Sequence, residues 1–528
     1  MIIGIDFGTC FSCVAFMNGA IPVTDYIKDP NKTGIPTIFM YSRSLNKELY
    51  GYECLSAEAA MNSADVIRNM KRTVRENPNN LNATVMSGGK SYTIKDIVRK
   101  YLMYLIAQAK SAAIQSGEFS NTNIEGVTIT APVGIAEGQM TATDYNKLLV
   151  DTITEITGLS KNKVSVLQEP VSAAISYLYS ENIKKKYSNK QTILVFDLGG
   201  GTLDVTIVEH NPTTMEYVIK AKEGDLKLGG NNWDEALSNA VLNKVGIADS
   251  FSAAVEKSRF QKSIIRLKHD LTDNEDSTIV FKYNGSTKFA DFTRTEFEQT
   301  TRNLLDRAVV VTKKAISSFS GLSGIDKIIL VGGSSNMPQI RKRMLSEFAS
   351  LGAANIITHD PSKAIAKGAA IYSKMEASRP VGGTNPQKIV VKDIATHTYG
   401  FNCRRGSDKK AMIYNLLFKG TPFGSDGKIV VKSDTHFVAG EDSQTVLEWV
   451  VYESDGKKGV GENANLMEYG SNENKNGMRV TTHIPSEYLG KARSYPCCVT
   501  FSLDVNGILE IIITDKNGNR IGYDKKQI

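Results

Sequence analysis

One pattern occurs twice in the sequence and constrains the fold more than any other feature. An apolar run ends in an aspartate, a glycine turn carrying a threonine follows, and a second apolar run returns; the copies are Ile3–Thr9 and Leu194–Thr202. Their aspartates, Asp6 and Asp197, lie 191 positions apart, the size of half a large domain. A single copy would be an ordinary tight hairpin. Two copies in the same order predict two similar lobes.

The residue types in these turns suit a phosphate group. Glycine has no Cβ, so backbone N–H groups can approach an anion closely. Threonine adds a hydroxyl donor, and an aspartate at the end of a strand can hold Mg²⁺ through its water ligands. Both turns are therefore predicted to face the same phosphate-bearing ligand.

Two further glycine turns occur, at Val331–Ser334 and Leu228–Asn231. The first follows the strand-like run Lys327–Leu330 and precedes a helix that we expect Asn336 to open, with Pro338 in its first turn. This arrangement suits a nucleotide near a helix N-terminus. The second turn is a weaker signal, because a glycine pair usually marks only a change of chain direction.

The order of predicted elements divides the chain in two. Strand-like runs alternate with helical patterns up to about residue 375, which is typical of an α/β fold. One helix is predicted to begin at Thr295, where Glu298 completes a capping box, and to continue to Phe319. The composition changes near Ser378, and no helix would cross the turn-rich segment Arg379–Pro386.

Beyond this break the helical patterns end and short β-strands are predicted. Gly, Asn, Asp and Lys separate the apolar runs, which include Ile429–Val431, Val446–Val451, Cys498–Leu503 and Leu509–Ile513. About 135 residues of this kind fit a compact sandwich.

Composition excludes several classes of protein. The 528 residues are too many for one core, and 41% hydrophobic with 23% charged residues is ordinary for a globular chain. No apolar stretch is long enough to span a membrane, and Met1 leads into a strand rather than a signal peptide, so we expect a cytoplasmic protein. The net charge of +7 is dispersed, which argues against nucleic acid. The six cysteines lack metal or redox spacing and are expected to be free thiols.

Taken in order, five segments resemble those of the seventy-kilodalton heat-shock chaperone family, of DnaK type. The phosphate loops of that family are similar to Ile3–Val14 and Asp197–Asp204, its connecting segment to Glu169–Ala174, and its adenosine motif to Val331–Pro338. Phe501–Leu509 resembles a signature of its substrate domain. Actins and sugar kinases share the phosphate loops, but only the chaperones carry the last segment.

The resemblance implies a complete architecture. Residues 1–379 would form an α/β actin-like ATPase domain with two similar lobes, 380–393 an interdomain linker, and 394–528 an all-β sandwich substrate-binding domain. ATP or ADP with Mg²⁺ would be the cofactors. The implied partners are unfolded or extended client polypeptides, a J-domain co-chaperone and a nucleotide exchange factor, in a role in protein folding and the stress response.

The resemblance also implies roles for individual residues. Lys71 would position the attacking water and stabilise the γ-phosphate, while Glu169 and the Mg²⁺-holding Asp6 and Asp197 would arrange the ion and its waters. The catalytic group is expected to be Lys71, Glu169, Asp197 and Thr202. The residues expected to contact the nucleotide are Gly8, Thr9, Cys10, Phe11, Gly199, Gly200, Gly201, Thr202, Gly229, Gly230, Lys268, His269, Thr272, Gly332, Gly333 and Ser334. Such a reaction needs charge neutralisation and in-line positioning rather than covalent chemistry.

The adenine side departs from the family pattern. Ile265 stands in place of a glutamate, His269 in place of the arginine that stacks on adenine, Asn336 in place of a flanking arginine, and Ser362 in place of an aspartate. An imidazole lacks the broad guanidinium plane, so we expect weakened nucleotide affinity beside an intact phosphate site. Met140 likewise replaces an arginine of the family's coupling relay.

Gln387–Asp393 resembles the family's interdomain linker. Its expected linker residues are Ile389, Val390, Val391 and Asp393. The segment is predicted to add to a sheet edge of the nucleotide domain in one state and to leave it in another. The alternative is that it is simply the first strand of the next domain.

The peptide groove is expected to include Met412, Ile413 and Leu416, unless these residues form sandwich core. Ile528 follows soon after the last predicted strand, so we expect a short or truncated family member without the helical lid.

Three functions compete. The first is an ATPase chaperone that converts ATP and water to ADP and phosphate slowly and binds apolar peptide segments. The second is an ATP-binding co-chaperone or nucleotide exchange factor with little hydrolysis. The third, an actin-like filament or sugar kinase, leaves the β-rich part without an explanation.

Overall fold

The computed structural model describes residues 1–24, 34–58, 65–77, 80–117, 122–132, 140–183, 189–319, 321–377, 390–395, 397–424, 426–454, 465–468, 474–505 and 508–527. The chain divides into two units, Met1–Gly134 with Asp144–Val391, and Ile135–Thr143 with Lys392–Ile528. The predicted break at Arg379–Pro386 and the linker residue Ile389 lie outside the described residues. The chain is a mixed α/β protein.

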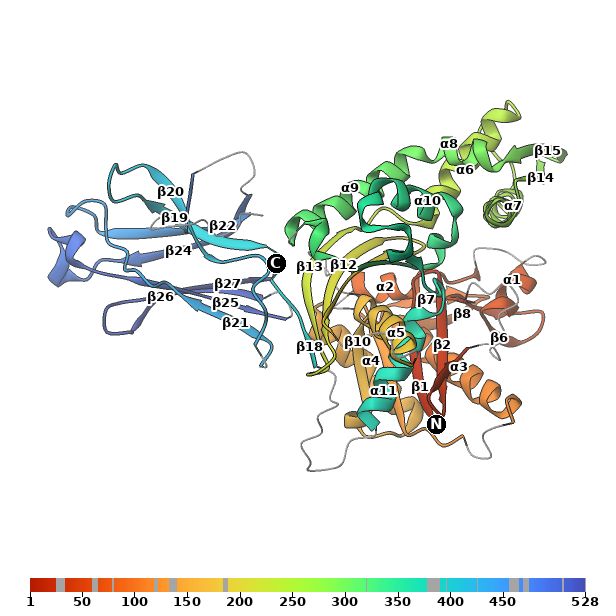
Figure 1. The fold of residues 1–528 in the computed structure, drawn as a ribbon, viewed down its shortest axis with the longest axis horizontal. Coiled ribbons are helices and arrows are strands. Elements are labelled where there is room, and N and C mark those ends of the chain that lie inside the picture. The colour runs from red at the N-terminus through yellow and green to blue at the C-terminus, as the bar shows by residue number, and fades with distance from the viewer. Residues whose placement is uncertain are drawn as a thin grey trace. The chain divides into compact units, whose positions relative to one another are not determined.

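Two large sheets in the first unit have the same topology (Figure 1). In each, three antiparallel strands are followed on one side by two parallel ones. The first sheet runs β3 (Ile21–Val23), β2 (Phe11–Asn18), β1 (Ile2–Asp6), β9 (Gly126–Ala131) and β10 (Val164–Gln168), with β4 (Ile35–Pro36) beside β2. The second runs β18 (Val390–Lys392), β13 (Glu216–Asp225), β12 (Leu203–Asn211), β11 (Gln191–Leu198), β16 (Lys327–Val331) and β17 (Ile356–Thr358). The repeated motif is thus the first hairpin of each sheet.

Two helices fill the space between these sheets (Figure 1). α11 (Ala364–Ala377) packs on β1, β2 and β9, α5 (Glu169–Ile183) packs on β11 and β12, and the two helices contact each other. Glycine permits both close approaches. A Cβ on Gly4 of β1 would lie 2.1 Å from a backbone nitrogen of α11, and one on Gly368 would lie 1.8 Å from the carbonyl oxygen of Ser172.

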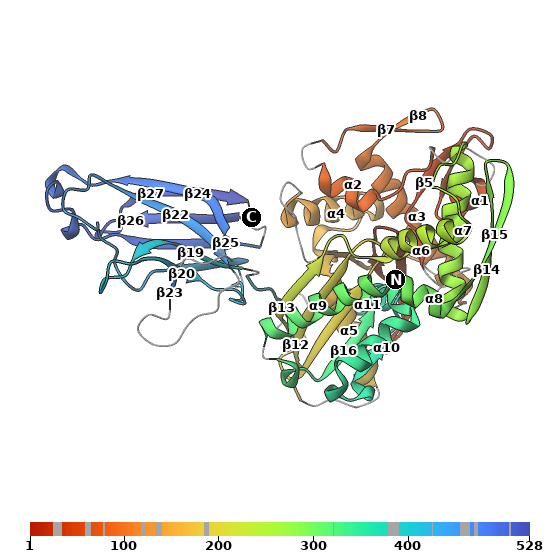
Figure 2. The same ribbon diagram turned by 90° about the horizontal axis from the view of Figure 1, so that it is seen from above.

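The other helices before Ala377 are α1 (Tyr52–Glu58), α2 (Met70–Glu76), α3 (Ile94–Gln115), α4 (Ala142–Thr157), α6 (Gly230–Lys244), α7 (Ala254–Asp273), α8 (Arg294–Thr300), α9 (Arg302–Ser318) and α10 (Pro338–Glu347). α3 covers β2, and α9 covers β12 and β13. Three hairpins stand outside the large sheets: β5 (Phe39–Ser42) with β6 (Lys47–Tyr50), β7 (Thr84–Ser87) with β8 (Lys90–Thr93), and β14 (Asp276–Tyr283) with β15 (Ser286–Thr293). Figure 2 shows α7 beside the last of them.

Local sequence explains how α3 is placed. The Thr93 hydroxyl accepts the Asp96 N–H at 3.0 Å, which caps the helix, and the Asp96 carboxylate favours the positive end of the helix dipole. Ile97, Tyr101 and Leu105 then recur at helical spacing and are buried.

The predicted helix start at Thr295 is wrong. The capping box is formed by Thr293 and Glu296, two residues earlier, where the Thr293 Oγ1 accepts the Glu296 N–H at 3.2 Å and the Glu296 carboxylate accepts the Thr293 N–H at 2.8 Å. The helix that follows is also interrupted at Thr301, so the predicted single helix is α8 followed by α9. The same Thr-x-x-Glu spacing occurs at Thr293 and at Thr295. The helix begins after Thr293 because β15 ends at that residue.

Two antiparallel sheets form the second unit. The first has the order β23 (Leu466–Glu468), β20 (Ala411–Leu417), β19 (Thr398–Arg404), β22 (Val446–Ser454) and β24 (Asn474–His483), and the second has β21 (Lys428–Lys432), β25 (Cys498–Asp504), β26 (Ile508–Thr514) and β27 (Arg520–Gln527). The four predicted strands at 429–431, 446–451, 498–503 and 509–513 are confirmed.

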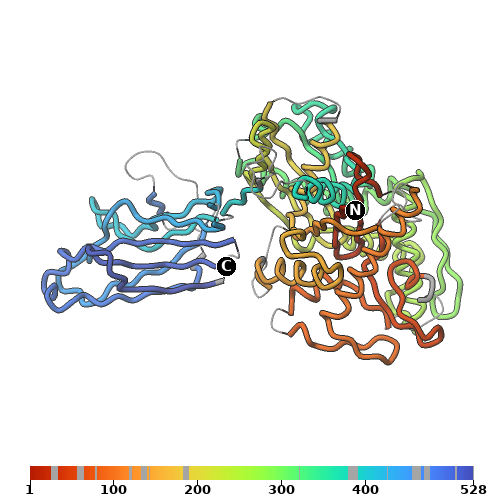
Figure 3. Tube along the Cα trace, turned by 90° about the horizontal axis from the view of Figure 1, so that it is seen from below, coloured from red at the N-terminus to blue at the C-terminus, as the bar shows by residue number. Residues whose placement is uncertain are grey.

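Both sheets of the second unit contribute to one apolar core. The Phe401 ring lies 5.6 Å from Trp449 in its own sheet and 6.2 Å from Phe501 in the other, measured between ring centroids. Figure 3 follows these strands as two layers of chain. In the described part after Lys392, helical residues occur only as 3₁₀ turns. Among the described helices of the whole chain, none is both long and apolar enough to cross a bilayer.

Candidate functional site

The two repeated turns contact each other in the first unit. A Cβ on Gly200, in the turn after β11, would lie 2.6 Å from the Sγ of Cys10 in the turn after β1. The Gly199 N–H donates to the Thr202 carbonyl at 3.0 Å and closes the second turn. Because both turns follow the first strand of equivalent sheets, the sequence repeat produces two facing glycine turns.

The glycine pair Gly229–Gly230 lies directly on the second turn. The Gly230 N–H donates to the Gly199 carbonyl at 3.0 Å, and the Asn231 N–H donates to the Gly200 carbonyl at 2.8 Å. A Cβ on Gly229 would lie 2.5 Å from backbone atoms of Gly201. The Gly229–Gly230 turn, which is the weakest of the glycine signals in the sequence, therefore belongs to the same site as the repeated turns.

The Gly332 turn completes this group of turns. Gly332 has φ +80°, and a Cβ there would lie 2.4 Å from the Oδ1 of Asp197, so only glycine fits. The Ser334 hydroxyl donates to the Gly199 carbonyl at 2.9 Å. The predicted helix opening at Asn336 is wrong, because α10 begins at Pro338 with Met337 as its N-cap.

Buried carboxylates gather at the ends of the first strands. Burial, followed by the charge of Glu169, raises the pKa of Asp6 to about 7. Burial also raises the pKa of Asp204 to about 6, again with Glu169 next in importance. The pKa of Asp197 is raised well above its ordinary value by burial and by the charges of Glu169, Asp204 and Asp6. Burial is the first cause for all three, so ionisation of these carboxylates is costly unless a cation lies close to them.

Lys71 is the cation among these acids. Its side chain, in the first turn of α2, is 6% exposed and forms an ion pair with Glu169, the first residue of α5. Burial is the largest influence on the pKa of Lys71 and would lower it, but the charges of Glu169 and Asp6 and the hydrogen bond to Glu169 together raise the pKa. Lys71 is thus a charged ammonium group held in the interior.

Hydroxyls from the second repeated turn and from β9 contact these acids, and the first turn is partly exposed. The Thr202 hydroxyl donates to Asp204 at 3.2 Å, and the Thr130 hydroxyl donates to Asp6 at 3.3 Å. Thr9 is partly buried, and Phe11 is 37% exposed. A Cβ on Gly8 would lie 1.9 Å from the Phe11 carbonyl, so the tight first turn requires glycine there.

The predicted adenine-side residues lie on α7 and near the Gly332 turn. Lys268 forms a 2.7 Å ion pair with Asp234 and donates to the Gly230 carbonyl at 3.3 Å, which joins α7 to the glycine turns. The pKa of His269 is lowered, first by burial and then by the charge of Lys268. The Thr272 hydroxyl donates to the Lys268 carbonyl.

The positions at which this chain departs from the family's adenine-site residues are partly exposed to solvent. Ile265 is 39% exposed, and the Asn336 side chain donates to the Gly333 carbonyl at 3.0 Å. Within the described residues, the buried Ser362 hydroxyl has no hydrogen-bond partner, and it lies 3.8 Å from where a Cβ on Gly333 would be. An unpaired buried hydroxyl beside a glycine turn suits a polar ligand.

Sequence reasoning missed Asp204, Asp234 and Arg72. Asp204 lies directly across the β11–β12 hairpin from Asp197, so strand pairing of the repeated motif would have identified it. Arg72 approaches the second turn, with a guanidinium nitrogen 3.2 Å from where a Cβ on Gly201 would be. Asp234 gave no signal in the sequence, because its pairing with Lys268 depends on how α6 packs against α7.

The buried carboxylates are suited to a metal ion that keeps its water ligands. Among the described residues, no three His, Cys, Asp or Glu side chains lie close enough to ligate a metal ion directly. If Asp6 and Asp197 hold a metal ion only through its water ligands, no such cluster of direct ligands is required. Their pKa values are raised first by burial and then by the charge of Glu169, and a divalent cation nearby would favour their ionised forms.

The predicted linker and groove residues have distinct environments. Val390 and Val391 belong to β18, which pairs with β13 at the edge of the second large sheet. The Asp393 carbonyl accepts the Phe423 N–H at 2.8 Å. Met140, the predicted relay position, is buried.

The three groove residues of β20 are all buried but in different surroundings. Leu416 belongs to the main core of the second unit. Ile413 belongs to a separate apolar cluster with Val450 and Tyr452, against which Met467 packs. Met412 is 3% exposed.

Comparison with known proteins covers nearly the whole chain. The family model described as Hsp70 protein matches residues 2–522. The chaperone protein DnaK of Halobacterium salinarum, in each of two strains, is 26% identical over 531 residues, an alignment that spans 98% of this chain and 74% of that protein. The matched range contains both repeated sheets and the antiparallel sheets up to the first residues of β27.

Proposed function

The chain belongs to the Hsp70 family, and from this membership we propose that it is an ATP-dependent molecular chaperone that binds extended apolar peptide segments. The observation that carries the proposal is a family match that runs through both units, from residue 2 to residue 522. In this proposal residues 1–379 are an actin-like ATPase domain, 380–393 the linker and 394–528 the substrate-binding domain. Its partners are client polypeptides, a J-domain co-chaperone and a nucleotide exchange factor.

The phosphates of ATP would bind at the facing glycine turns. The turns are those of Gly8–Phe11, Gly199–Thr202, Gly229–Gly230 and Gly332–Ser334. The mutual contacts of these segments support one shared ligand, since a Cβ at several of these positions would fill the space or clash. On the adenine side, Lys268, His269 and Thr272 would lie along the base and ribose.

Lys71 would hold and orient the water that attacks the γ-phosphate. Its ammonium group is buried and charged, and a buried cation stabilises developing negative charge more strongly than an exposed one. Glu169 fixes that ammonium group through the ion pair and would accept a hydrogen bond from the water. A bound Mg²⁺, held by Asp6 and Asp197 largely through water, would neutralise phosphate charge.

The edge strand β18 supports coupling between nucleotide and peptide. Val390 and Val391 extend the second large sheet next to β13. An added strand is held by main-chain hydrogen bonds and can dissociate as a unit. We propose that this strand pairs in one nucleotide state and leaves in the other, which requires a difference of about 1–3 kcal/mol between the states.

For the peptide groove, we propose the cluster around Ile413, whose members are buried in the described part of the second unit. Val450, Tyr452 and Met467 surround this residue, apart from the main core that contains Leu416. An extended peptide would be bound there through main-chain hydrogen bonds and apolar pockets. Met412 would border the same surface.

His269 favours a second candidate function. Burial lowers the pKa of this imidazole, so it is neutral at pH 7 and cannot supply the cation that an arginine would place on the base. Weak nucleotide binding with little hydrolysis would suit an ATP-binding co-chaperone or nucleotide exchange factor.

Single-turnover hydrolysis separates the two candidates. The purified full chain is loaded with ATP and Mg²⁺, and conversion to ADP is followed together with ATP affinity. The chaperone proposal expects stoichiometric conversion that ends in bound ADP. Stable binding of ATP without conversion would favour the co-chaperone, and a lack of ATP binding would contradict both candidates.

A further inference from the structure

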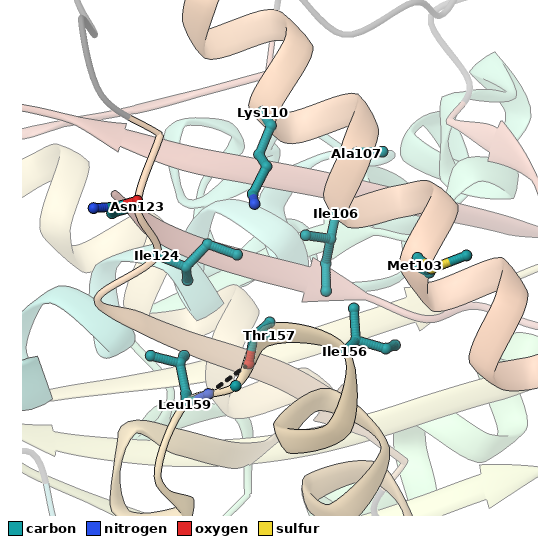
Figure 4. Close-up of a pocket in the computed structure, with 10 residues that line it drawn as sticks. Met103, Ile106, Ala107, Lys110, Asn123, Ile124, Ile156, Thr157 and Leu159 are labelled. Atoms are coloured by element: carbon teal, nitrogen blue, oxygen red, sulfur yellow. Dashed lines mark hydrogen bonds between the residues drawn. The ribbon is translucent and has the colours of Figure 1, made fainter.

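A cavity of about 530 Å³ lies between α3 and the C-terminal end of α4. Its apolar wall consists of Met103, Ile106, Ile124, Ile156 and Leu159. Figure 4 shows Ile106 and Ile156 pointing towards each other across this space. The volume is in the range of small-molecule sites. Polar groups of Lys110, Asn123 and Thr157 share the lining with the apolar wall, which suits a ligand with a polar and an apolar end.

Lys110 gives the cavity its charge. Among the described lining residues it alone is ionisable, and its side chain extends into the space beside Ile106 (Figure 4). In the part of the chain that the structure describes, Lys110 makes no ion pair. The two acids adjacent to the wall are already engaged, Glu125 with the amino group of Met1 at 2.8 Å and Glu155 with Arg99 at 3.6 Å.

We propose that this cavity binds a small aliphatic carboxylate, with the carboxylate on Lys110 and the hydrocarbon chain along the apolar wall. A chain of about ten carbons fits within the volume and buries enough CH₂ groups to bind measurably. A neutral hydrocarbon would leave the Lys110 ammonium group without a partner. The C-terminal carbonyls of α4 at Thr157 repel an anion, so the carboxylate lies on the α3 side.

The cavity is separate from the nucleotide site. Ile124 precedes β9 and Leu159 precedes β10, whereas Thr130 and Glu169 stand at or beyond the opposite ends of these strands. A ligand in the cavity therefore contacts none of the residues proposed to bind ATP, and its binding does not depend on the proposed hydrolysis.

Calorimetric titration of the nucleotide-free full chain with decanoate tests the proposal. Wild type is expected to bind one equivalent, and decanol at least about tenfold more weakly, because a charge-assisted hydrogen bond is lost. Lys110→Glu reverses the anchoring charge and should weaken decanoate binding by at least about tenfold. Ala107→Trp, at an exposed position of the lining, should block binding by filling the cavity.

Lys95→Glu is the matched control, since Lys95 is an exposed lysine of α3 away from the cavity. It should leave decanoate affinity unchanged, and circular dichroism should show all three variants folded. Absence of binding to wild type would overturn the proposal. Equal binding by wild type, Lys110→Glu and Ala107→Trp would also overturn it, as would displacement of decanoate by an apolar heptapeptide, which would move the ligand to the second unit.

Discussion

At the scale of single residues, the phosphate site is defined by its imbalance of charge. Asp6, Glu169, Asp197 and Asp204 are buried or partly buried together, and Lys71 is the cation paired with them. Burial raises the cost of every uncompensated charge, so such a group persists where function requires it. In the proposed reaction, the phosphates and a cation complete the charge balance.

Lys71→Ala tests the role of the buried ammonium group. Its removal should lower kcat for ATP hydrolysis by about 10²–10³, the scale of losing one preorganised electrostatic stabiliser, while ATP still binds. Quenched-flow or phosphate-release kinetics measure the change. Lys95→Ala, on an exposed part of α3, is the control and should hydrolyse at the parental rate. Parental activity in Lys71→Ala would remove this residue from the catalytic group.

Asp204→Asn tests the cost of an ionised carboxylate at this buried position, next to Glu169, through the pH dependence of stability. The folded-state pKa of about 6 is above the ordinary value of 3.8, so ionisation of Asp204 destabilises the fold progressively from about pH 4 to pH 6 and by a constant amount above that. The variant should therefore melt higher than wild type at pH 8, by about 2–4 °C for each kcal/mol relieved, and equally near pH 4. Calorimetry of the nucleotide-free proteins measures the melting temperature at both pH values. An equal shift at the two pH values would refute ionisation of the buried carboxylate as the cause.

The two glycine turns could be located from the sequence because aspartate, glycine and threonine lie close together in each hairpin. The ligand roles of these residues stay predictions. Asp234 could not be found in this way, since it meets Lys268 only through packing of α6 on α7. Gly229–Gly230 was undervalued because its partner is the Gly199–Gly201 turn, about 30 residues earlier.

At the scale of elements, periodicity predicted strands and helices better than it predicted their ends. The Thr-x-x-Glu spacing occurs at Thr293 and at Thr295, and only the hydrogen-bonded end of β15 at Thr293 selects the first. A capping box is read from three residues, whereas a helix start also depends on where the preceding strand stops pairing. No glycine or proline marks the interruption at Thr301, so the sequence did not predict it.

Gly368→Ala tests the close approach of α11 and α5. Alanine normally favours a helix, but its Cβ would lie 1.8 Å from the Ser172 carbonyl oxygen. We expect overpacking to destabilise the first unit by about 1–3 kcal/mol, measured by urea unfolding. Gly406→Ala, where no atom lies within 4 Å of the added Cβ, is the control and should be nearly neutral. Equal stability of both variants would show that the helices can separate without cost.

The edge strand β18 tests the coupling proposal. Replacing Ile389, Val390 and Val391 together by aspartate should abolish stimulation of ATPase by peptide, because charged side chains disfavour a strand on an apolar sheet edge. The basal rate should persist. Val430→Asp introduces a charge on an exposed strand valine of the second unit and should keep the stimulation. Peptide stimulation that survives the triple replacement would reduce the segment to a spacer.

At the scale of the whole molecule, one chain forms two units with different architectures. The first repeats a mixed sheet with helices between the copies, and the second encloses one core between antiparallel sheets. The change from helical to strand patterns near Ser378 predicted both architectures, since periodicity persists over many residues. The exact limits of the domains depend on few residues and stay predictions.

Coupling of the two units is the central claim, and steady-state phosphate release from the purified full chain tests it most directly. The rate is measured with ATP and Mg²⁺, with and without a saturating apolar heptapeptide, and Lys71→Ala provides the background. The account predicts slow hydrolysis above that background which rises when peptide binds. Hydrolysis no faster than in Lys71→Ala, or a rate that bound peptide leaves unchanged, would contradict it.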